Sequence, residues 1–216
     1  MATTGIVIPC YNRPHYLKKC LTSLEDSHIL AHTAIYIIDD CSTNEHTKEL
    51  IKNFKCSGVE VIKKYNTENK GVADCLKQGF DYFYENDYEI LCNLDADAIV
   101  NAWWQFRLNE LYLKHKGNIL SGFNAGNSAY YDKGKDKKTH YEKDRVLGLN
   151  LYFNSGMYKY IKEALEKEEF WDVELTQIIR DNKKKFIVTK PSVVQHIGME
   201  SVMKHNCQAR ALDFEI

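Results

Sequence analysis

The stretch Tyr88-Glu-Ile-Leu-Cys-Asn-Leu-Asp-Ala-Asp97 carries the strongest signal in the sequence. Its apolar run predicts a buried strand, and the Asp95-Ala96-Asp97 triplet that closes it predicts the start of a loop. Two carboxylates placed two residues apart at the exit of a strand can converge on one divalent cation, directly or through its water. Mg²⁺ or Mn²⁺ held by only one or two protein carboxylates usually takes its remaining ligands from substrate phosphates and water. The triplet therefore predicts either a cation site for chemistry on a phosphorylated leaving group or a pair of solvated loop acids.

The composition predicts a single globular domain over residues 1–216. Hydrophobic residues make up 44% of the chain and charged residues 27%, which is typical of a folded protein. The net charge of −1 gives no argument for binding to nucleic acid. No apolar run approaches the roughly 18 residues that span a bilayer, and the N-terminus lacks the pattern of a signal peptide. We therefore expect a cytoplasmic protein with no membrane-spanning segment, no nucleic-acid partner and reduced cysteines.

Strands alternate with helices over the first 100 residues. Apolar runs predict strands at 6–8, 34–38, 59–62 and 88–94, and helical spacing predicts the helices between them. This alternation is typical of an α/β fold with a mainly parallel sheet that helices cover on both sides. Ligands of such sheets bind beyond the carboxyl ends of the strands. The polar segments of the sequence fall at those ends: Pro9–Arg13, Asp39-Asp40, Asn66–Gly71 and Asp95–Asp97.

The second half of the chain is less regular. The predicted elements are, in order, a helix at 101–116, a strand at 118–122, a loop at 124–145, a strand at 146–153, helices at 154–167 and 170–181, and a strand at 185–189. In the first of these helices we expect Trp103, Trp104 and Phe106 to be largely buried. The long polar loop is either a solvated loop or a lid on the acceptor side of a site.

Three loops at the predicted strand ends carry side chains that suit a nucleotide. In Pro9–Arg13, the ring of Tyr11 can stack on a base and the amides of the following helix can meet a diphosphate. This loop contains no Gly-rich phosphate-binding motif, so a plain strand-to-helix turn is the alternative. Asp40 either accepts a hydrogen bond from a base or ribose, or caps the following helix. Lys70 and Gly71 suit a phosphate that approaches the backbone closely, or a turn into a helix.

Two acids and a histidine in the second half complete the candidate residues. Asp172 and Glu174 lie about 200° apart around a helix, so they cannot share a face unless one of them belongs to the preceding loop. One acid that points into a cleft can serve as general base for an incoming hydroxyl, whereas acids at a helix start also simply favour the helix dipole. His196 follows the last predicted strand. Its neutral imidazole either completes the coordination sphere of the Asp95 and Asp97 cation or is an ordinary satisfied polar group.

Taken together, these residues resemble the GT-A fold of nucleotide-sugar glycosyltransferases, most closely family 2, over residues 5–198. The resemblance rests on four segments in the family's order: Gly5–Arg13, Ile35–Thr43, Asn66–Gly71 and Asn93–Asp97. It implies a Rossmann-like nucleotide-binding half, residues 1–100, an acceptor-side catalytic half, residues 101–198, and a tail, residues 199–216. It also implies metal-dependent transfer of a sugar from a nucleotide-diphosphate donor, most often a UDP-sugar, to a hydroxyl of a glycan or glycoprotein, with Mn²⁺ or Mg²⁺ as cofactor.

The resemblance implies roles for individual residues as well. Asp97 is expected to bind the metal directly, Asp95 to contact the ribose or metal-bound water, and His196 to be the late metal ligand. Asp172 matches the acid that serves as base in inverting members, and Glu174 is the second choice. The residues expected at the nucleoside are Pro9, Tyr11 and Asp40, those near the diphosphate, ribose or donor sugar are Lys70 and Asp74, and Asn12, Arg13, Asp95 and Ala96 complete the donor-binding set.

Departures from the family pattern leave alternatives open. The third segment continues as Asn69-Lys-Gly-Val-Ala-Asp74 in place of the more usual Asn-Xaa-Gly-Xaa-Xaa-Xaa-Ala-Arg-Asn, so the contacts to the donor sugar stay open. Trp171-Asp172 stands where the family usually has Glu-Asp. Asn154-Ser-Gly156 resembles a turn of some retaining GT-A enzymes, so a retaining transferase is an alternative to an inverting one. Further alternatives are a sugar-phosphate nucleotidyltransferase, which normally carries a Gly-rich loop after its first strand, and a non-catalytic nucleotide- or carbohydrate-binding module.

Overall fold

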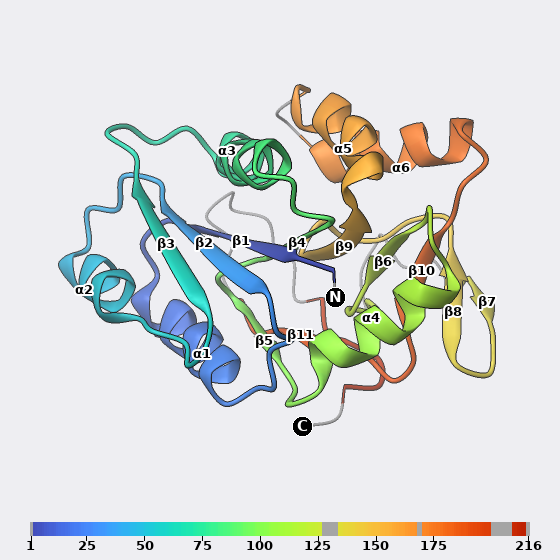
Figure 1. The fold of residues 1–216 in the computed structure, drawn as a ribbon, viewed down its shortest axis with the longest axis horizontal. Helices are drawn as coiled ribbons and strands as arrows, with labels where there is room; N and C mark the ends of the chain where they lie inside the picture. Colours follow the sequence, from blue (N-terminus) through green and yellow to red (C-terminus); the bar gives the residue numbers. More distant parts are fainter. Residues whose placement is uncertain (1, 127–133, 168–169, 200–208, 215–216) are drawn as a thin grey trace.

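The computed structural model describes residues 2–126, 134–167, 170–199 and 209–214 (Figure 1). Among them, nine strands form one sheet in the order β3-β2-β1-β4-β9-β6-β10-β8-β7, and β5 (Ala98–Val100) pairs with β11 (Val194–His196) in a second, two-stranded sheet. The strands of the large sheet are β1 (Thr4–Cys10), β2 (Thr33–Asp39), β3 (Glu60–Tyr65), β4 (Ile90–Leu94), β6 (Ile119–Ser121), β7 (Lys135–Asp136), β8 (His140–Lys143), β9 (Asn150–Asn154) and β10 (Phe186–Thr189).

One end of the large sheet is parallel, as the alternation of strands and helices predicts. β3, β2, β1 and β4 all run in the same direction. β9 is antiparallel to both of its neighbours, β4 and β6, so the strand direction changes in the middle of the sheet. The carboxyl ends of the four parallel strands therefore share one edge, and the polar segments that follow them lie along it.

Helices cover both faces of the sheet (Figure 1). Because successive side chains of a strand point to opposite faces, Ile6 and Ile8 of β1 pack into one core and Val7 packs into the other. The first core is closed by α1 (Pro14–Glu25), α2 (Glu45–Asn53) and α4 (Trp104–Lys114). The second core is closed by α3 (Val72–Glu85), by α5 (Tyr158–Leu165) with its leading turn η1 (Ser155–Met157), and by α6 (Trp171–Asp181). The predicted α/β architecture is confirmed.

The structure differs from the prediction at several places in the second half. One is β11, which follows the strand at 185–189 that was expected to be the last. The strand expected at 146–153 begins only at Asn150, and residues 146–149 form a loop that packs against α6. The loop expected at 124–145 contains the β7–β8 hairpin, and its part at 127–133 lies outside the described residues. Trp103 and Phe106 are 54% and 42% exposed, whereas Trp104 is fully buried. The helix starts at Trp104, and its phase turns only that one of the three rings toward the sheet.

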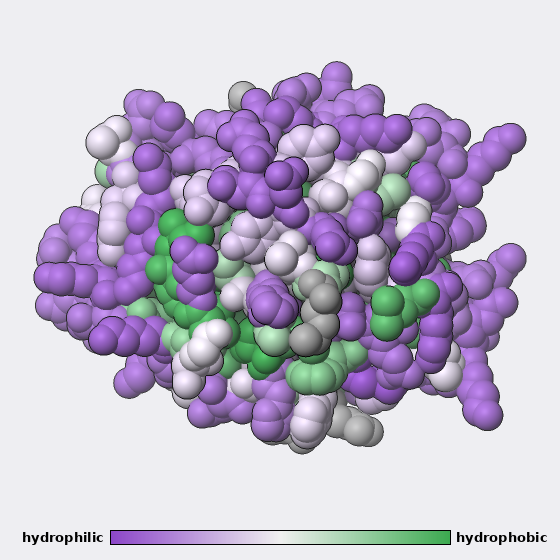
Figure 2. Space-filling model, in the orientation of Figure 1, coloured by the Kyte–Doolittle hydropathy of each residue, from purple (hydrophilic) through white to green (hydrophobic). Residues whose placement is uncertain are grey.

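The face of the molecule seen in Figure 1 is mostly hydrophilic, with an apolar area over β2 and β3 (Figure 2). The cysteines that the structure describes are free thiols, most of them buried. This agrees with the expectation of reduced cysteines that serve as small apolar side chains. In the part of the chain that the structure describes, no helix is long and apolar enough to cross a membrane.

Candidate active site

A cleft of about 620 Å³ lies at the edge where the parallel strands end. Its walls come from the loop after β1, the segment before α3, the turn after β4, the loop before β9, the start of α6 and the end of β11. The predicted site residues that line it are Pro9, Tyr11, Asn12, Arg13, Asp40, Lys70, Asp74, Asp95, Ala96, Asp97, Asp172 and His196. The tertiary structure thus gathers residues from both halves of the chain into one cleft.

His196 reaches Asp97 through the small sheet. In the antiparallel pair of β5 and β11, His196 lies opposite Ala98, and the backbone N–H of Ile197 donates to the carbonyl of Asp97 at 2.9 Å. This register brings the imidazole Nε2 to 3.3 Å from Asp97 Oδ2, across a sequence separation of 99 residues. The pairing of two three-residue strands therefore decides that these two predicted metal ligands meet.

Arg13 approaches Asp97 from the β1 side. Its Nη1 donates to Asp97 Oδ2 at 2.9 Å, and its guanidinium carbon lies 4.5 Å from the centre of the Tyr16 ring. Burial acts to raise the pKa of Asp97, but the hydrogen bond from His196 and the charge of Arg13 outweigh burial and hold the pKa below its usual value. Asp97 is therefore an ionised carboxylate at neutral pH.

Asp95 is held in a different environment. Its backbone N–H donates to Leu149 O at 3.0 Å, and its side-chain Oδ1 is shielded from solvent without a hydrogen-bond partner among the described groups. Burial, and then repulsion by Asp97 and Asp172, raise the pKa of Asp95 well above its ordinary value. A buried carboxylate oxygen without a partner is costly, so this position calls for a cation or a donor group.

The groups around Asp97 fit a divalent cation. His196 Nδ1 lies 3.2 Å from Ala209 O, so the ring can carry its proton on Nδ1 and offer the lone pair of Nε2 to a cation in place of the hydrogen bond to Asp97 Oδ2. Gly198 keeps the space open, because a Cβ atom there would overlap Asp97 Oδ2 and lie 2.7 Å from His196 Nε2. Among the described residues, no three Asp, Glu, His or Cys side chains already surround one point, and Asp95 Oδ1 is a buried oxygen without a partner at a residue of the same cleft.

The first turn of α6 presents one of its two acids to the cleft. Asp172 lines the cleft and its Oδ2 accepts from the backbone N–H of Gly148 at 3.4 Å. Burial raises the pKa of Asp172, against the opposing effects of the Gly148 N–H and the charge of Arg145. Glu174 is exposed and is not among the residues that line the cleft. Trp171 is buried beneath the loop at 146–149 and sets the phase of α6. Glu174 lies about 200° around the helix from Asp172 and therefore faces solvent.

Asp40 organises the loop that leads into α3. Its carboxylate accepts hydrogen bonds from Asn66 Nδ2 at 2.9 Å and from the backbone N–H groups of Lys70 and Gly71 at 2.9 and 2.8 Å. The alternative that Asp40 caps the following helix is wrong, because Asn44 is the residue that caps α2. Asp40 instead holds Lys70 at the edge of the cleft.

Asn12 ties together two loops of the cleft. Its Oδ1 accepts from the backbone N–H groups of Thr43 and Asn44, both at 3.0 Å, and its own N–H donates to Ser42 Oγ at 2.7 Å. Asn12 has a left-handed backbone with φ 52°, a conformation that asparagine tolerates better than most residues. The loop after β1 is therefore fixed in place before any ligand binds.

The Asn154-Ser-Gly156 turn does not belong to the cleft. Asn154 pairs with Ile90 at the start of β4, whereas Asp95 follows the other end of that strand. The Asn154 side chain caps η1 by accepting from the N–H of Gly156 at 2.9 Å. The similarity of this turn to a sugar-binding turn of retaining enzymes is therefore not supported by its position.

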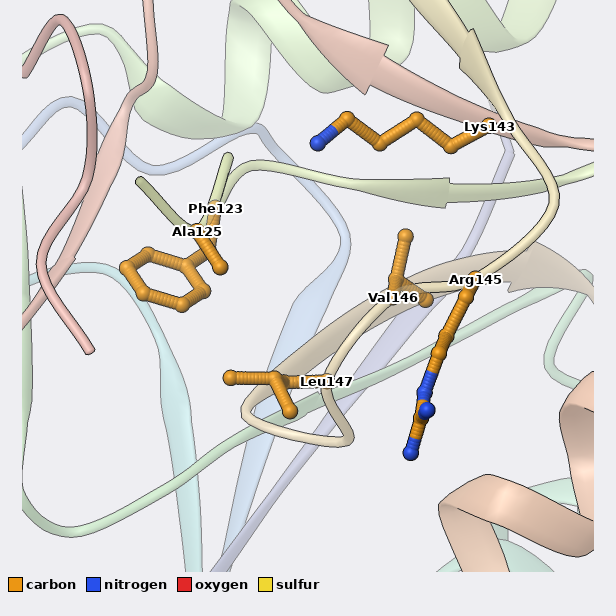
Figure 3. A pocket seen from close by; sticks show the side chains of 6 residues that line it. All are labelled: Phe123, Ala125, Lys143, Arg145, Val146 and Leu147. Carbon is orange, nitrogen blue, oxygen red and sulfur yellow. The ribbon is translucent and has the colours of Figure 1, made fainter. Parts of the chain in front are cut away.

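Some cleft residues were not singled out from the sequence. They include Phe123, Gly148, Leu149 and Phe170. Gly148 had a usable signal, since a lone glycine inside an apolar strand pattern marks a close backbone approach or a bulge. A small cavity adjoins this wall of the cleft and shares Phe123 and Leu147 with it. In the view of Figure 3, Phe123 and Arg145 lie on opposite sides of Val146 and Leu147, which also line this cavity.

Comparisons with known proteins agree with this fold. The model of the family described as "Glycosyl transferase family 2" matches residues 5–170. Among solved structures, S. aureus TarS residues 1–349 in complex with UDP has a TM-score of 0.68 at 16% identity, covering 86% of this chain and 57% of that chain. The same protein in complex with UDP-GlcNAc has a TM-score of 0.63 at 16% identity, with 86% and 55% coverage. The chain spans 35% of the longer TarS structure, which it matches at 17% identity with a TM-score of 0.64 and 86% coverage of its own length. The search of curated proteins gave no significant match.

Proposed function

Because the chain belongs to glycosyl transferase family 2, we propose that it transfers a sugar from a nucleotide-diphosphate donor to a hydroxyl group of an acceptor. One observation carries the proposal: Asp97 and His196 meet in a cleft that the carboxylate of Asp172 also lines. Sugar transfer from a diphosphate needs both a centre that neutralises the leaving phosphates and a base that receives the proton of the acceptor.

A UDP-sugar is the proposed donor. The complexes of TarS with UDP and with UDP-GlcNAc belong to a protein of the same fold, and they support a uridine nucleotide here. The ring of Tyr11 lines the cleft and is available to stack on a base. Lys70, held by the contacts of Asp40 with its loop, and Arg13 supply positive charge for the diphosphate.

Mn²⁺ or Mg²⁺ is the proposed cofactor, with Asp97, His196 and Asp95 as the residues that would hold it directly or through water. Such an ion supplies a Lewis acid that neutralises the charge developing on the nucleoside diphosphate as it leaves. Aspartate oxygens and one imidazole nitrogen are ligands that Mn²⁺ and Mg²⁺ accept when substrate phosphates and water complete the set.

Asp172 is the proposed general base of an inverting transfer. An acceptor hydroxyl gives its proton to the Asp172 carboxylate while its oxygen forms a bond to the anomeric carbon. The bond between that carbon and the diphosphate oxygen breaks on the opposite side, which inverts the configuration. Burial raises the pKa of Asp172 and so makes its carboxylate a better proton acceptor than an exposed aspartate. The acceptor is proposed to be a glycan or a glycoprotein.

Calorimetric titration of the purified protein with UDP and, separately, with GDP tests the donor and the metal together. Each titration is run with and without Mn²⁺. We expect UDP to bind far more tightly with Mn²⁺, GDP to bind weakly, and the Asp97→Ala variant to lose the dependence on Mn²⁺ while it keeps its unfolding midpoint. Glu174→Gln is the matched control, because it removes a carboxylate charge outside the cleft.

Each outcome has a distinct meaning. Binding of neither nucleotide would overturn the transferase proposal and favour an interaction module on the same fold. UDP binding that is independent of Mn²⁺ would keep the donor assignment and remove the metal. A donor hydrolysis assay then separates an enzyme from a non-catalytic binding protein, since only the enzyme releases UDP from a UDP-sugar.

A further inference from the structure

Gly148 lies where the wall of the cleft meets the start of α6. A Cβ atom at this position would overlap Trp171 Cζ2 and lie 2.7 Å from Cη2, both atoms of the six-membered ring of the indole. A heavy atom cannot occupy that space unless the indole or the loop moves. Trp171 is 7% exposed and immediately precedes Asp172, so a displaced indole carries the first turn of α6 with it.

The loop that contains Gly148 is anchored and has little freedom to yield. The carbonyl of Gly148 accepts from Asn93 Nδ2 at 2.6 Å, and Asn93 Oδ1 accepts from the N–H of Leu151 at 3.0 Å. One end of the Asn93 amide therefore fixes the loop to β4, and the other end fixes the start of β9, which directly follows the loop. One residue further on, the carbonyl of Leu149 accepts from the N–H of Asp95 at 3.0 Å. The same loop is thus bonded to the strand that delivers the two aspartates of the proposed metal site.

We propose that Gly148 is a positioning residue that sets the distance between Asp172 and the Asp95–Asp97 pair. This inference rests on the proposed function, in which Asp172 is the base. The carbonyl face of the loop is bonded to β4, while the N–H of Gly148 donates to Asp172 Oδ2 at 3.4 Å and its bare Cα receives Trp171. Gly148 acts as a spacer of minimum size between the proposed base and the proposed metal site. A base must stand within hydrogen-bond reach of its proton, so its placement affects turnover far more than donor binding.

Four variants separate positioning from simple packing. Gly148→Ala adds the methyl group, Trp171→Phe removes the outer ring that the methyl would strike, and the double variant combines both changes. Gly5→Ala is the matched control, because a Cβ there would lie 2.6 Å from Phe83 Cδ1 and closer still to Cγ, against another buried ring. Gly5 lies in β1 at the end opposite the cleft, so this control disturbs the core and leaves the site alone.

The readouts are UDP release from UDP-GlcNAc with Mn²⁺, UDP affinity by calorimetry, and the midpoint of urea unfolding. We expect Gly148→Ala to lower the rate of UDP release about 100-fold, the loss typical of a catalytic group misplaced by about 1 Å. Its UDP affinity should stay within about twofold, since the nucleotide loops are untouched. The double variant should recover at least about tenfold of the lost rate. Gly5→Ala should lower the unfolding midpoint with an unchanged rate of UDP release.

Several outcomes would overturn the inference. One is a Gly148→Ala rate equal to that of the wild type. Another is a rate of UDP release by Gly148→Ala that falls only in proportion to its loss of unfolding stability, as in a simple packing defect. A third is a double variant, Gly148→Ala with Trp171→Phe, that recovers none of the lost rate. The Asp172→Asn variant distinguishes a wrong positioning role for Gly148 from a wrong proposed function. If Asp172→Asn releases UDP at the wild-type rate, the assignment of Asp172 as the base is wrong. If the wild type releases no UDP from UDP-GlcNAc, crystal structures of the wild type and Gly148→Ala decide, because an Asp172 carboxylate that stays in place overturns the positioning role.

Discussion

Arg13 Nη1 lies 2.9 Å from Asp97 Oδ2, the same oxygen that His196 Nε2 approaches to 3.3 Å. A carboxylate oxygen that ligates a divalent cation has less electron density to offer a guanidinium, so Arg13 and the proposed cation would compete for Asp97. Arg13 Nη2 is buried and has no hydrogen-bond partner among the described groups. A donor phosphate would offer that nitrogen, and the displaced Nη1, a charge-assisted partner. We therefore expect cation binding and nucleotide binding to favour each other through Arg13.

Replacement of Arg13 tests this competition directly. Arg13→Met removes the charge and keeps much of the length, so Mn²⁺ should bind the nucleotide-free protein about two- to fivefold more tightly, the range for a partly exposed ion pair. UDP should bind the same variant more weakly, because the diphosphate loses a cationic partner. Titration with Mn²⁺ followed by electron paramagnetic resonance, with and without UDP, measures both effects. Arg13→Lys keeps the charge and serves as the control. Equal Mn²⁺ affinity in Arg13→Met and the wild type would contradict the competition.

Replacement of Asp40 should destabilise the protein. Asp40→Asn places an amide NH₂ against backbone N–H donors at Lys70 and Gly71, which leaves donors without an acceptor. The expected loss is about 1–3 kcal/mol in the free energy of unfolding, measured by urea titration. UDP affinity should fall as well, since the loop that carries Lys70 loses its anchor. Glu68→Gln in the same exposed loop is the control and should change stability by less than about 0.5 kcal/mol. A neutral effect of Asp40→Asn would mean that the loop does not depend on this carboxylate.

Replacement of Asp172 should separate chemistry from binding. Asp172→Asn keeps the shape of the side chain and removes its basicity, so UDP release from a UDP-sugar should fall by about 10²–10⁴-fold, the usual contribution of a general base. UDP affinity should remain nearly unchanged. Glu174→Gln makes the same chemical change two residues away on the exposed face of α6 and should keep the wild-type rate. Loss of UDP binding in Asp172→Asn would instead argue for a role in holding the donor.

The pH dependence of turnover should report Asp172. Burial raises the pKa of Asp172, with Gly148 N–H and the charge of Arg145 acting in the opposite direction. A base acts only in its deprotonated form, so kcat/KM should fall as the pH drops through this raised pKa. The acidic limb should therefore lie above the ordinary aspartate value of about 3.9. Arg145→Gln removes a charge that favours the carboxylate and should move the limb to higher pH, whereas Lys116→Gln should not. Rates of UDP release from about pH 4 to pH 8 measure the limb. A limb at the ordinary value in the wild type would contradict the assignment.

The nucleotide half of the cleft could be predicted from the sequence because its residues are placed by the strands directly before them in the chain. Each polar segment directly follows a strand, and parallel strands joined by helices must end at the same edge of the sheet. The placement of Tyr11, Asp40, Lys70 and Asp95 in one cleft follows from that rule. The second half resisted the same treatment. Its strands are short and partly antiparallel, so periodicity alone does not separate a strand at 146–149 from a loop that lies against α6.

The amino-acid sequence by itself determined the parallel half of the sheet, the family of the chain and the loops that meet in the cleft, because these depend on residues close together along the chain. Only the tertiary structure decided which distant groups face each other. The register of β5 against β11 brings His196 to Asp97, and the burial of Trp171 against Gly148 turns Asp172 toward the cleft. The register of a strand pair and the phase of a packed helix are set by side-chain contacts across the molecule, and a one-residue slip or a turn of about 100° would present a different residue.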